Sequence, residues 1–298
     1  MKSLMRLVPR WFVNNPTIRR WLFLYRFVKN NKYIPNFKNP KTFNEKINYR
    51  KNNPRHPLFS LCSDKIAAKK WVAERIGEEH IVPNYFVGGS ITSEKIKEVL
   101  TEMGDCLLKA NHNSGPVYLL TTESTEHEIS AACQDVNGQL LLDYGKRSNE
   151  PWYSEIKPMV LVEKRLNPEP GESSVRDYKF HVFRQEDGTF KIVVEVHFDQ
   201  AINHTISYFD EGLNWLPITI EYPNIVTSIS KPINYELMVE KAKVLAKEFT
   251  YVRVDFYNIE GSIYFGELTF AKTGGGAIFM NKMYDLWMGK FWHGDPSY

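Results

Sequence analysis

The segment from Val252 to Phe270 constrains this chain more than any other, because it predicts a β-hairpin that brings two carboxylates together. Runs of β-branched and aromatic residues flank Ile259-Glu260-Gly261, and a three-residue loop ending in a left-handed glycine is a common hairpin connection. With that loop, Arg253 lies opposite Glu267. Asp255 is then a diagonal neighbour of Glu267, about 7–8 Å away, on the same face. Such a pair can bind one or two hard cations.

The register of this hairpin leaves alternatives open. A two-residue loop would turn Glu267 to the opposite face, because successive side chains of a strand alternate between faces. Charges that line up on a solvated face are the other interpretation of the same pattern.

Composition sets wider limits. The chain has 298 residues, of which 43% are hydrophobic and 14% aromatic, as expected for a globular protein of one elaborate domain or two. Its three cysteines form no CxxC motif and have no histidine at zinc spacing, so we expect neither a disulfide framework nor a structural zinc. No apolar run reaches the length of a membrane span, and the first residues lack the pattern of a signal peptide. We therefore expect a cytoplasmic protein, with a peripheral position on the inner face of a membrane as the alternative.

Charge is distributed unevenly along the chain. Residues 1–55 carry fourteen Lys and Arg and a single acid, Glu45, which leaves 24 basic and 34 acidic residues in the remainder. Aromatic residues such as Trp11, Trp21 and Tyr25 lie within this basic aromatic arm. It is typical of a segment that lies on an anionic membrane surface, and it could instead bind an anionic glycan, dock a partner protein, or pack on the body with its charges in water. We expect no nucleic acid partner, because the body is acidic and contains no known nucleic-acid motif.

The hydrophobic periodicity predicts a mixture of helices and strands. We expect helices over 64–76, with Ser63 as N-cap, and over 93–103, 130–144 and 237–249. Strands are predicted over 106–109, 117–121, 159–166, 178–183 and 191–198, followed by the hairpin. The polar residues 167–176 predict a loop.

Three strand ends carry candidate binding residues. Lys109 precedes a turn rich in Asn, Ser and Gly, a combination suited to phosphate although it lacks the P-loop spacing. Glu163 and Lys164 end a strongly apolar strand, where they could meet a purine. Asp177 and Lys179 share one face of the next strand. Taken singly, each pattern also fits an ordinary exposed strand end.

The order of these pieces resembles the ATP-grasp superfamily and, more narrowly, the TupA-like ATP-grasp family associated with teichuronopeptide and bacterial surface-polysaccharide synthesis. The resemblance covers about residues 38–290. It rests on the stretches NPKTFNEKINYRK, SDKIAAKKWVAERIG, LLKANHNSG, VLVEKRL, DYKFHVF and VRVDFY, and on GELTF with the GGG that follows it.

This resemblance implies an α+β fold in which two α+β subdomains clasp ATP, preceded by the basic aromatic helical arm. The implied divisions are an arm over 1–55, a helical lead-in over 56–105, a small subdomain with the phosphate loop and adenine hinge over 106–166, and a large subdomain with the metal site over 167–298.

The resemblance also implies roles for individual residues. The implied ATP-binding residues are Lys109, Asn113, Ser114, Gly115, Glu163, Lys164, Leu166, Asp177 and Lys179. The implied magnesium ligands are Asp255, Glu267 and Thr269, where many members have Asn in place of Thr269. Arg253, with Lys109, is the implied catalytic residue and faces the acyl phosphate. Lys65 and His181 are secondary candidates for substrate contact.

The activity that this implies is ligation of a carboxylate to an amine, with ATP and Mg²⁺ as cofactors and an acyl phosphate as intermediate. The expected substrates are an amine or amino acid and a uronic acid of a bacterial surface polysaccharide or of its nucleotide- or lipid-linked precursor. Two alternatives remain: an ATP-grasp kinase that phosphorylates a glycan hydroxyl, and a non-catalytic nucleotide- or glycan-binding module that recruits a glycosyltransferase.

Overall fold

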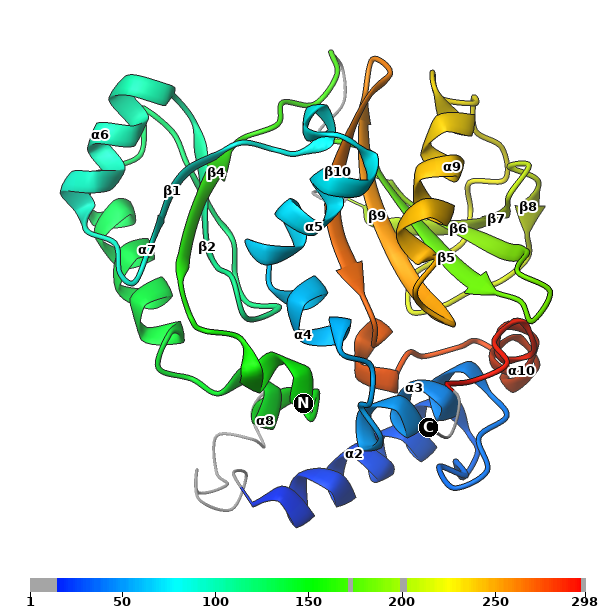
Figure 1. Ribbon diagram of the computed structural model, residues 1–298. Helices are drawn as coiled ribbons and strands as arrows, with labels where there is room; N and C mark the ends of the chain where they lie inside the picture. Colours follow the sequence, from blue (N-terminus) through cyan, green and yellow to red (C-terminus); the bar gives the residue numbers. More distant parts are fainter. Residues whose placement is uncertain (1–14, 171–173, 199–202, 296–298) are drawn as a thin grey trace.

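The structure is a computed structural model that describes residues 15–170, 174–198 and 203–295. Two antiparallel sheets stand side by side, and the short helices α4 (Leu58–Ser63) and α5 (Ala67–Ile76) lie between them (Figure 1). The fold is α+β, as the sequence predicts. No helix within the described residues is long and apolar enough to cross a membrane.

The smaller sheet has the strand order β1-β4-β2-β3. Its strands are β1 (Asn84–Gly88), β2 (Cys106–Ala110), β3 (Tyr118–Leu120) and β4 (Val160–Lys164). Helices α6 (Ser93–Met103) and α7 (Glu126–Gln139) cover its outer face and share a separate hydrophobic core with it (Figure 1). Both helices begin at a threonine cap, because the Thr92 and Thr125 hydroxyls accept hydrogen bonds from backbone N–H groups of the first turn.

The larger sheet has the strand order β10-β9-β5-β6-β7-β8, and every neighbouring pair is antiparallel. Its strands are β5 (Asp177–Arg184), β6 (Phe190–Phe198), β7 (Thr205–Asp210), β8 (Trp215–Leu216), β9 (Tyr251–Ile259) and β10 (Ser262–Thr269). Helix α9 (Tyr235–Ala246) packs on β5 and β9, with Tyr235 against Phe180. The main hydrophobic core therefore lies between this sheet and α9, α5 and α4.

Four further helices complete the described fold: α2 (Pro16–Asn31), α3 (Phe43–Asn52), α8 (Tyr144–Ser148) and α10 (Lys282–Phe291). Helix α3 belongs to the body and not to a separate arm. Phe43 and Ile47 are fully buried, and the Arg50 guanidinium binds the Asp295 carboxylate at 2.6 and 2.7 Å. The expected arm over 1–55 is therefore wrong in its second half, because its cations hold the C-terminal segments in place. Residues 1–14 of the predicted arm lie outside the described residues.

The β9–β10 hairpin corrects the predicted register twice. Ser262 pairs with Ile259, so the loop has two residues, Glu260 and Gly261, both with positive φ (48° and 86°) as a type I′ turn requires. The expected three-residue loop is wrong. With the observed two-residue loop alone, Glu267 would lie on the opposite face of the sheet.

A β-bulge at Gly266 supplies the second correction. The register shifts between Phe265 and Glu267, so that Glu267 lies directly opposite Asp255 and Thr269 opposite Arg253. The extra residue reverses the alternation of side chains along β10. It therefore offsets the effect of the shorter loop on the face of Glu267. Glu267 consequently shares a face with Asp255 and Arg253, as a direct partner of Asp255 and not a diagonal one.

Two further boundaries differ from the predictions. Strand β1 is part of the smaller sheet, and helix α6 packs on that sheet. The expected domain boundary at residue 106 therefore divides one structural unit. The helix predicted over 64–76 begins only at Ala67, and Ser63 does not cap it because its hydroxyl has no hydrogen-bond partner among the described residues.

Candidate active site

The larger sheet presents two different faces to its surroundings. Alternation along β5 and β9 directs apolar side chains such as Phe180 and Phe256 towards α9. It directs Lys179, Arg253 and Asp255 to the opposite face, where Asp255 lies between Lys179 on β5 and Glu267 on β10. Charged side chains from three adjacent strands therefore meet on one patch of the sheet.

Asp255 is the centre of this patch. Arg253 donates to both of its carboxylate oxygens at 2.7 Å, and Lys179 donates to Oδ2 at 2.8 Å. Burial alone would raise the pKa of Asp255, but the two cations lower it to about 2, so the group is ionised. Lys179 also binds Asp177, and these two carboxylates hold its pKa above the ordinary value despite its burial.

Arg253 extends the patch to Glu267, donating to Oε1 at 2.7 Å from the nitrogen that also binds Asp255. Thr269 donates its hydroxyl to the same Glu267 oxygen at 2.9 Å. The Glu267 side chain is 46% exposed, whereas that of Asp255 is 3% exposed. Glu267 is thus the outer, accessible carboxylate of the pair.

The donor set of this patch fits a magnesium ion that is shared with a ligand. No group of three or more His, Cys, Asp or Glu side chains among the described residues could hold a metal by itself. Magnesium commonly binds through one or two carboxylates together with phosphate oxygens, and Asp255 with Glu267 matches that requirement. Thr269 orients Glu267 in the structure; its role as a direct ligand stays a prediction.

The smaller sheet contributes a second charged cluster, centred on Glu163. Lys109 on β2 forms an ion pair with Glu163 on β4, and Lys69 of α5 binds the other Glu163 oxygen at 2.8 Å. Burial would raise the pKa of Glu163, but both lysines lower it. Glu163 is therefore ionised and forms ion pairs with both Lys69 and Lys109.

Lys65 and Tyr257 connect the two clusters. Lys65 lies in the turn before α5, donates to the backbone carbonyl of Asn113, and interacts electrostatically with Glu267, Lys109 and Glu163. Burial lowers the pKa of Lys65 to about 8. Tyr257 of β9 likewise interacts with Glu267 of its own sheet and Glu163 of the other. Residues predicted to bind phosphates and metal are thus close enough to influence one another.

The loop after β2 is closely packed at its start and open at Ser114. Asn113 is buried, donates to Gln139 at 2.8 Å and accepts from the Gly115 N–H at 3.0 Å. A methyl group at Gly115 would lie 2.6 Å from Gln139 Oε1 and 2.9 Å from the Asn113 amide, so these two side chains would have to shift. Ser114 is exposed. The loop therefore offers a fixed backbone beside Lys65 and Lys109.

The remaining residues predicted to contact ATP differ in their burial and in their hydrogen bonds. Asp177 is buried, and its Oδ1 atom has no hydrogen-bond partner among the described residues, as suits an acceptor for a sugar hydroxyl. Lys164 is exposed and its N–H bonds to the carbonyl of Pro83, while Leu166 is half-buried beyond the end of β4. Their contact with adenine stays a prediction.

His181 is enclosed by protein, which corrects its expected role in substrate contact. It is completely buried, its ring nitrogens bond to Tyr251 Oη at 3.0 Å and Glu195 Oε2 at 2.9 Å, and it packs against Phe43 of α3. Burial lowers its pKa to about 4, so the ring is neutral.

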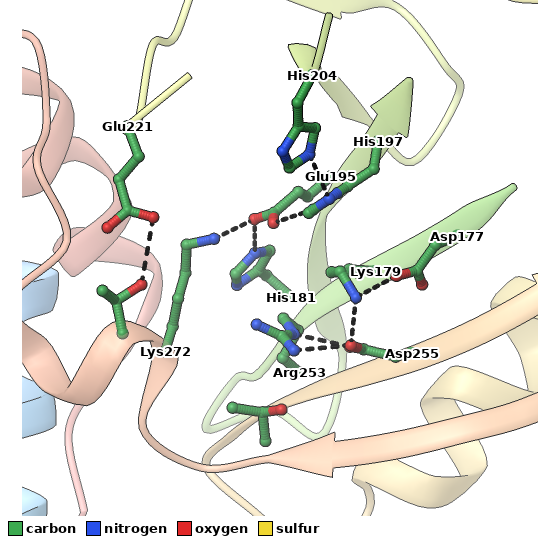
Figure 2. A network of polar contacts seen from close by, with 12 residues as sticks. Asp177, Lys179, His181, Glu195, His197, His204, Glu221, Arg253, Asp255 and Lys272 are labelled. Atoms are coloured by element: carbon green, nitrogen blue, oxygen red, sulfur yellow. Dashed lines mark hydrogen bonds and ion pairs between the residues drawn. The ribbon is translucent and has the colours of Figure 1, made fainter. Parts of the chain in front are cut away.

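Figure 2 shows a polar network around Glu195 that the sequence reasoning missed. The Glu195 carboxylate accepts from Lys272 and bonds with His181 and His197, and His197 bonds to His204 at 3.0 Å. Burial would raise the pKa of Glu195, but Lys272 and the histidine hydrogen bonds hold it well below the usual range. A glutamate inside the apolar run from Lys191 to Phe198 was the available signal.

A basic groove of about 780 Å³ lies between α2, α3 and α8. Its lining includes five cations and no carboxylate: Arg19, Arg20, Lys51, Lys146 and Arg147. Arg19 of α2 donates a hydrogen bond to the backbone carbonyl of Lys146 in α8 at 3.0 Å. Trp21, which also lines the groove, is 69% exposed. Binding of an anionic surface or partner by this region stays a prediction.

Comparisons with known proteins are consistent with this arrangement. A family model described as TupA-like ATPgrasp matches residues 45–293. No curated protein matches the sequence.

Several solved structures are distantly similar. D-alanyl-alanine synthetase A from Vibrio cholerae O1 biovar eltor shares 17% identity with a TM-score of 0.45, over 70% of this chain and 55% of that chain. D-alanine–D-alanine ligase from Bacillus anthracis shares 15% with a TM-score of 0.42, over 82% and 73%. ATP-grasp ligase PsnB with a minimal precursor shares 13% with a TM-score of 0.39, over 72% and 54%. The chain thus matches little more than half of the first of these proteins.

Proposed function

The chain belongs to the TupA-like ATP-grasp family, and from that membership we propose that it is an ATP-dependent ligase that joins a carboxylate to an amine through an acyl phosphate. The observation that carries the proposal is the direct pairing of Asp255 with Glu267 on a sheet face beside Lys65 and Lys109. Two carboxylates next to two lysines are the elements needed to hold a metal and the phosphates that share it.

The chemistry requires activation of the acid. A carboxylate is a poor electrophile because its leaving group would be oxide, whereas an acyl phosphate releases phosphate. A magnesium ion held by Asp255 and Glu267 would offset charge on the transferring phosphate. Lys109 and Lys65 would bind phosphate oxygens of the same nucleotide. Arg253, already fixed between the two carboxylates, would stabilise the oxyanion when the amine attacks.

We further propose that the acid is a uronic acid of a bacterial surface polysaccharide or its precursor, and that the amine is an amino acid or related compound. The basic groove supports an anionic substrate, because five cations line it, of which Lys146 pairs with Asp143 outside the lining. Residues of α2 would hold the saccharide, and the same surface would serve an anionic membrane or a glycosyltransferase partner.

The first experiment is a thermal-shift titration with Mg²⁺-ATP on the wild type and on Lys109→Ala. Glu163 keeps Lys69 as a partner in the variant, so the fold should survive. Lys97→Ala, an exposed lysine of α6, is the matched control. A rise in Tm that the control keeps and Lys109→Ala loses would support a nucleotide site at Lys109. Absence of a shift in all three proteins would refute the proposed nucleotide binding.

A second assay separates ligase from kinase. Hydroxylamine converts an acyl phosphate into a stable hydroxamate, so a ligase incubated with ATP and a uronic acid should form one. Release of ADP without hydroxamate would favour phosphorylation of a hydroxyl instead.

A further inference from the structure

The polar network around Glu195 (Figure 2) contains three hydrogen-bonded side chains that the reaction above does not use. Glu195 of β6 is 1% exposed, and its Oε1 atom bonds to Nε2 of His197 at 2.8 Å. Nδ1 of His197 bonds in turn to Nε2 of His204 at 3.0 Å. His204 lies directly before β7 and is half-buried, so this Glu-His-His triad runs from the protein interior towards the surface.

The strand register places the triad on the same sheet face as the Asp255–Glu267 pair. Glu195 pairs with Lys179 of β5, and Lys179 pairs with Asp255 of β9. Asp255 is in turn the direct partner of Glu267. Cross-strand partners lie on one face, and His197 follows Glu195 by two residues, so its side chain lies on that face as well. A single strand, β5, therefore separates the triad from the proposed magnesium carboxylates.

The hydrogen-bond partners assign the protons of the two histidines. Glu195 is ionised and can only accept, so Nε2 of His197 is the donor in that bond. In a neutral His197 the other nitrogen, Nδ1, then accepts from the Nε2–H of His204. This leaves a lone pair on Nδ1 of His204, to which no group of the described residues donates. The triad thus ends in a nitrogen that can act as a base.

The surroundings of His204 keep its ring in place and uncharged. The ring packs against that of Tyr222, with the centroids 4.1 Å apart. The other titratable groups that face it are His197 and Glu195 of β6 and Lys179 of β5. Burial lowers the pKa of His204, His197 and Lys179 lower it further, and Glu195 opposes them. A neutral imidazole can accept a proton at physiological pH.

The strand order separates the triad from the proposed nucleotide site. The lysines proposed to bind phosphates, Lys65 and Lys109, belong to the turn before α5 and to the smaller sheet, and α5 contacts β10. The triad lies on β6 and before β7, on the other side of the metal carboxylates (Figure 1). A phosphoryl acceptor approaches in line, opposite the leaving nucleotide, so we expect the acid and then the amine on this side. A lone pair repels a carboxylate but accepts from an ammonium group.

We propose that His204 is the general base for the amine substrate, with His197 and Glu195 as its positioning residues, a role that rests on the proposed ligase activity. Nδ1 of His204 takes one proton from the ammonium group and becomes part of an imidazolium, which leaves an amine with a free electron pair. That pair forms the C–N bond to the acyl carbon. The C–O bond to phosphate then breaks, and the phosphate leaves with that electron pair and the second nitrogen proton as HPO₄²⁻. The imidazolium later gives its proton to water.

The alternative is a structural role, in which the bond between His197 and His204 only fastens the start of β7 to β6. The two roles differ with hydroxylamine, which is uncharged at neutral pH and needs no base to become a nucleophile. An amino acid at the same pH carries an ammonium group and does need one. At pH 9 more of the amino acid is already deprotonated, so the need for a base is smaller.

The test compares wild type with His204→Gln, His197→Ala and the control His127→Gln, an exposed histidine of α7. Glutamine at position 204 keeps an N–H donor for His197 but cannot take up a proton. Each protein is incubated at pH 7 and pH 9 with Mg²⁺-ATP and glucuronate or galacturonate, and with hydroxylamine or a mixture of the common amino acids. Hydroxamate, amide product and Tm are measured, and Tm with its Mg²⁺-ATP shift establishes that each variant is folded.

The expected result is equal hydroxamate in all four proteins. At pH 7 amide formation should be about 100-fold lower in His204→Gln and about 10-fold lower in His197→Ala, and both differences should shrink at pH 9. Amide formation by His204→Gln at the wild-type rate would overturn the proposal. So would an equal loss of hydroxamate and amide, or a loss of amide that is the same at both pH values, because a structural role predicts these. If the wild type itself traps no hydroxamate, the ligase activity fails first and this role fails with it.

Discussion

Replacing Glu150 by glutamine should stabilise the protein at alkaline pH, whatever reaction it catalyses. The substitution keeps the size of the side chain and removes its ability to ionise. Burial raises the pKa of Glu150 from its ordinary 4.5 to about 7, so the folded protein holds this proton more tightly than the unfolded chain does. The stability that this contributes is present below pH 4.5 and is lost as the pH rises through 7.

The magnitude follows from the size of the shift. Each pKa unit corresponds to 1.36 kcal/mol, so a rise from 4.5 to about 7 costs about 3 kcal/mol once the group is ionised. Glu150→Gln avoids that cost and should be more stable than the wild type by about 3 kcal/mol at pH 8 and by about 1 kcal/mol at pH 5. For a chain of this length the difference at pH 8 corresponds to about 5 °C in Tm.

Urea unfolding at pH 5 and pH 8 measures the effect, with Glu155→Gln as an exposed control that should match the wild type at both values. The pKa argument requires a stability difference that grows with pH. A Glu150→Gln variant that is equally stable to the wild type at pH 8, or less stable, would refute it and show that donors reach the carboxylate in solution.

The other predictions concern the metal pair and the packing of the body. Glu267→Gln should lower turnover about 100-fold or more with Tm unchanged, while Glu260→Gln in the exposed turn should leave turnover intact; activity in Glu267→Gln would remove this residue from the site. Gly289→Ala should destabilise by about 3 kcal/mol, because its new methyl group would lie 2.4 Å from the backbone carbonyl of Lys41. Gly138→Ala in α7, where a methyl group meets nothing within 4 Å, should instead stabilise by about 0.5–1 kcal/mol, and unfolding curves of both variants test the contrast.

The sequence predicts those elements whose signals are local. Helix α6 spans Ser93–Met103 as expected, because Thr92 caps its start and Gly104, with φ of 81°, ends it. The strongly apolar β4 and the alternating β5 and β6 also lie within a few residues of their predicted positions. In each case the residues that define the element are next to it in the sequence.

Features that depend on distant contacts are not predictable in this way. Nothing in the sequence around Glu150 indicates burial, because Lys51 and Gly274 come next to it only in the folded chain. Arg50 looks like one more cation of a basic arm, yet it is 1% exposed and bonded to Asp295 at the other end of the chain. Charge counting along the sequence could not distinguish this buried arginine from the exposed Arg20.

The β9–β10 hairpin depends on local signals and on distant contacts. This explains why the predicted face of Glu267 is right although its predicted register is wrong. The turn follows local rules, with Gly261 in the left-handed region, but the bulge at Gly266 is set by the partner strand, since a methyl group there would lie 3.2 Å from the carbonyl of Asp255. Its consequence is a direct pair of like charges, Asp255 opposite Glu267, which by itself disfavours the sheet. Arg253 offsets this repulsion by bonding to both carboxylates. The bulge therefore keeps Asp255 and Glu267 in a repulsive pairing that needs a neighbouring cation. Such a pairing is expected where the binding of charged ligands, and not the stability of the sheet, determines the geometry.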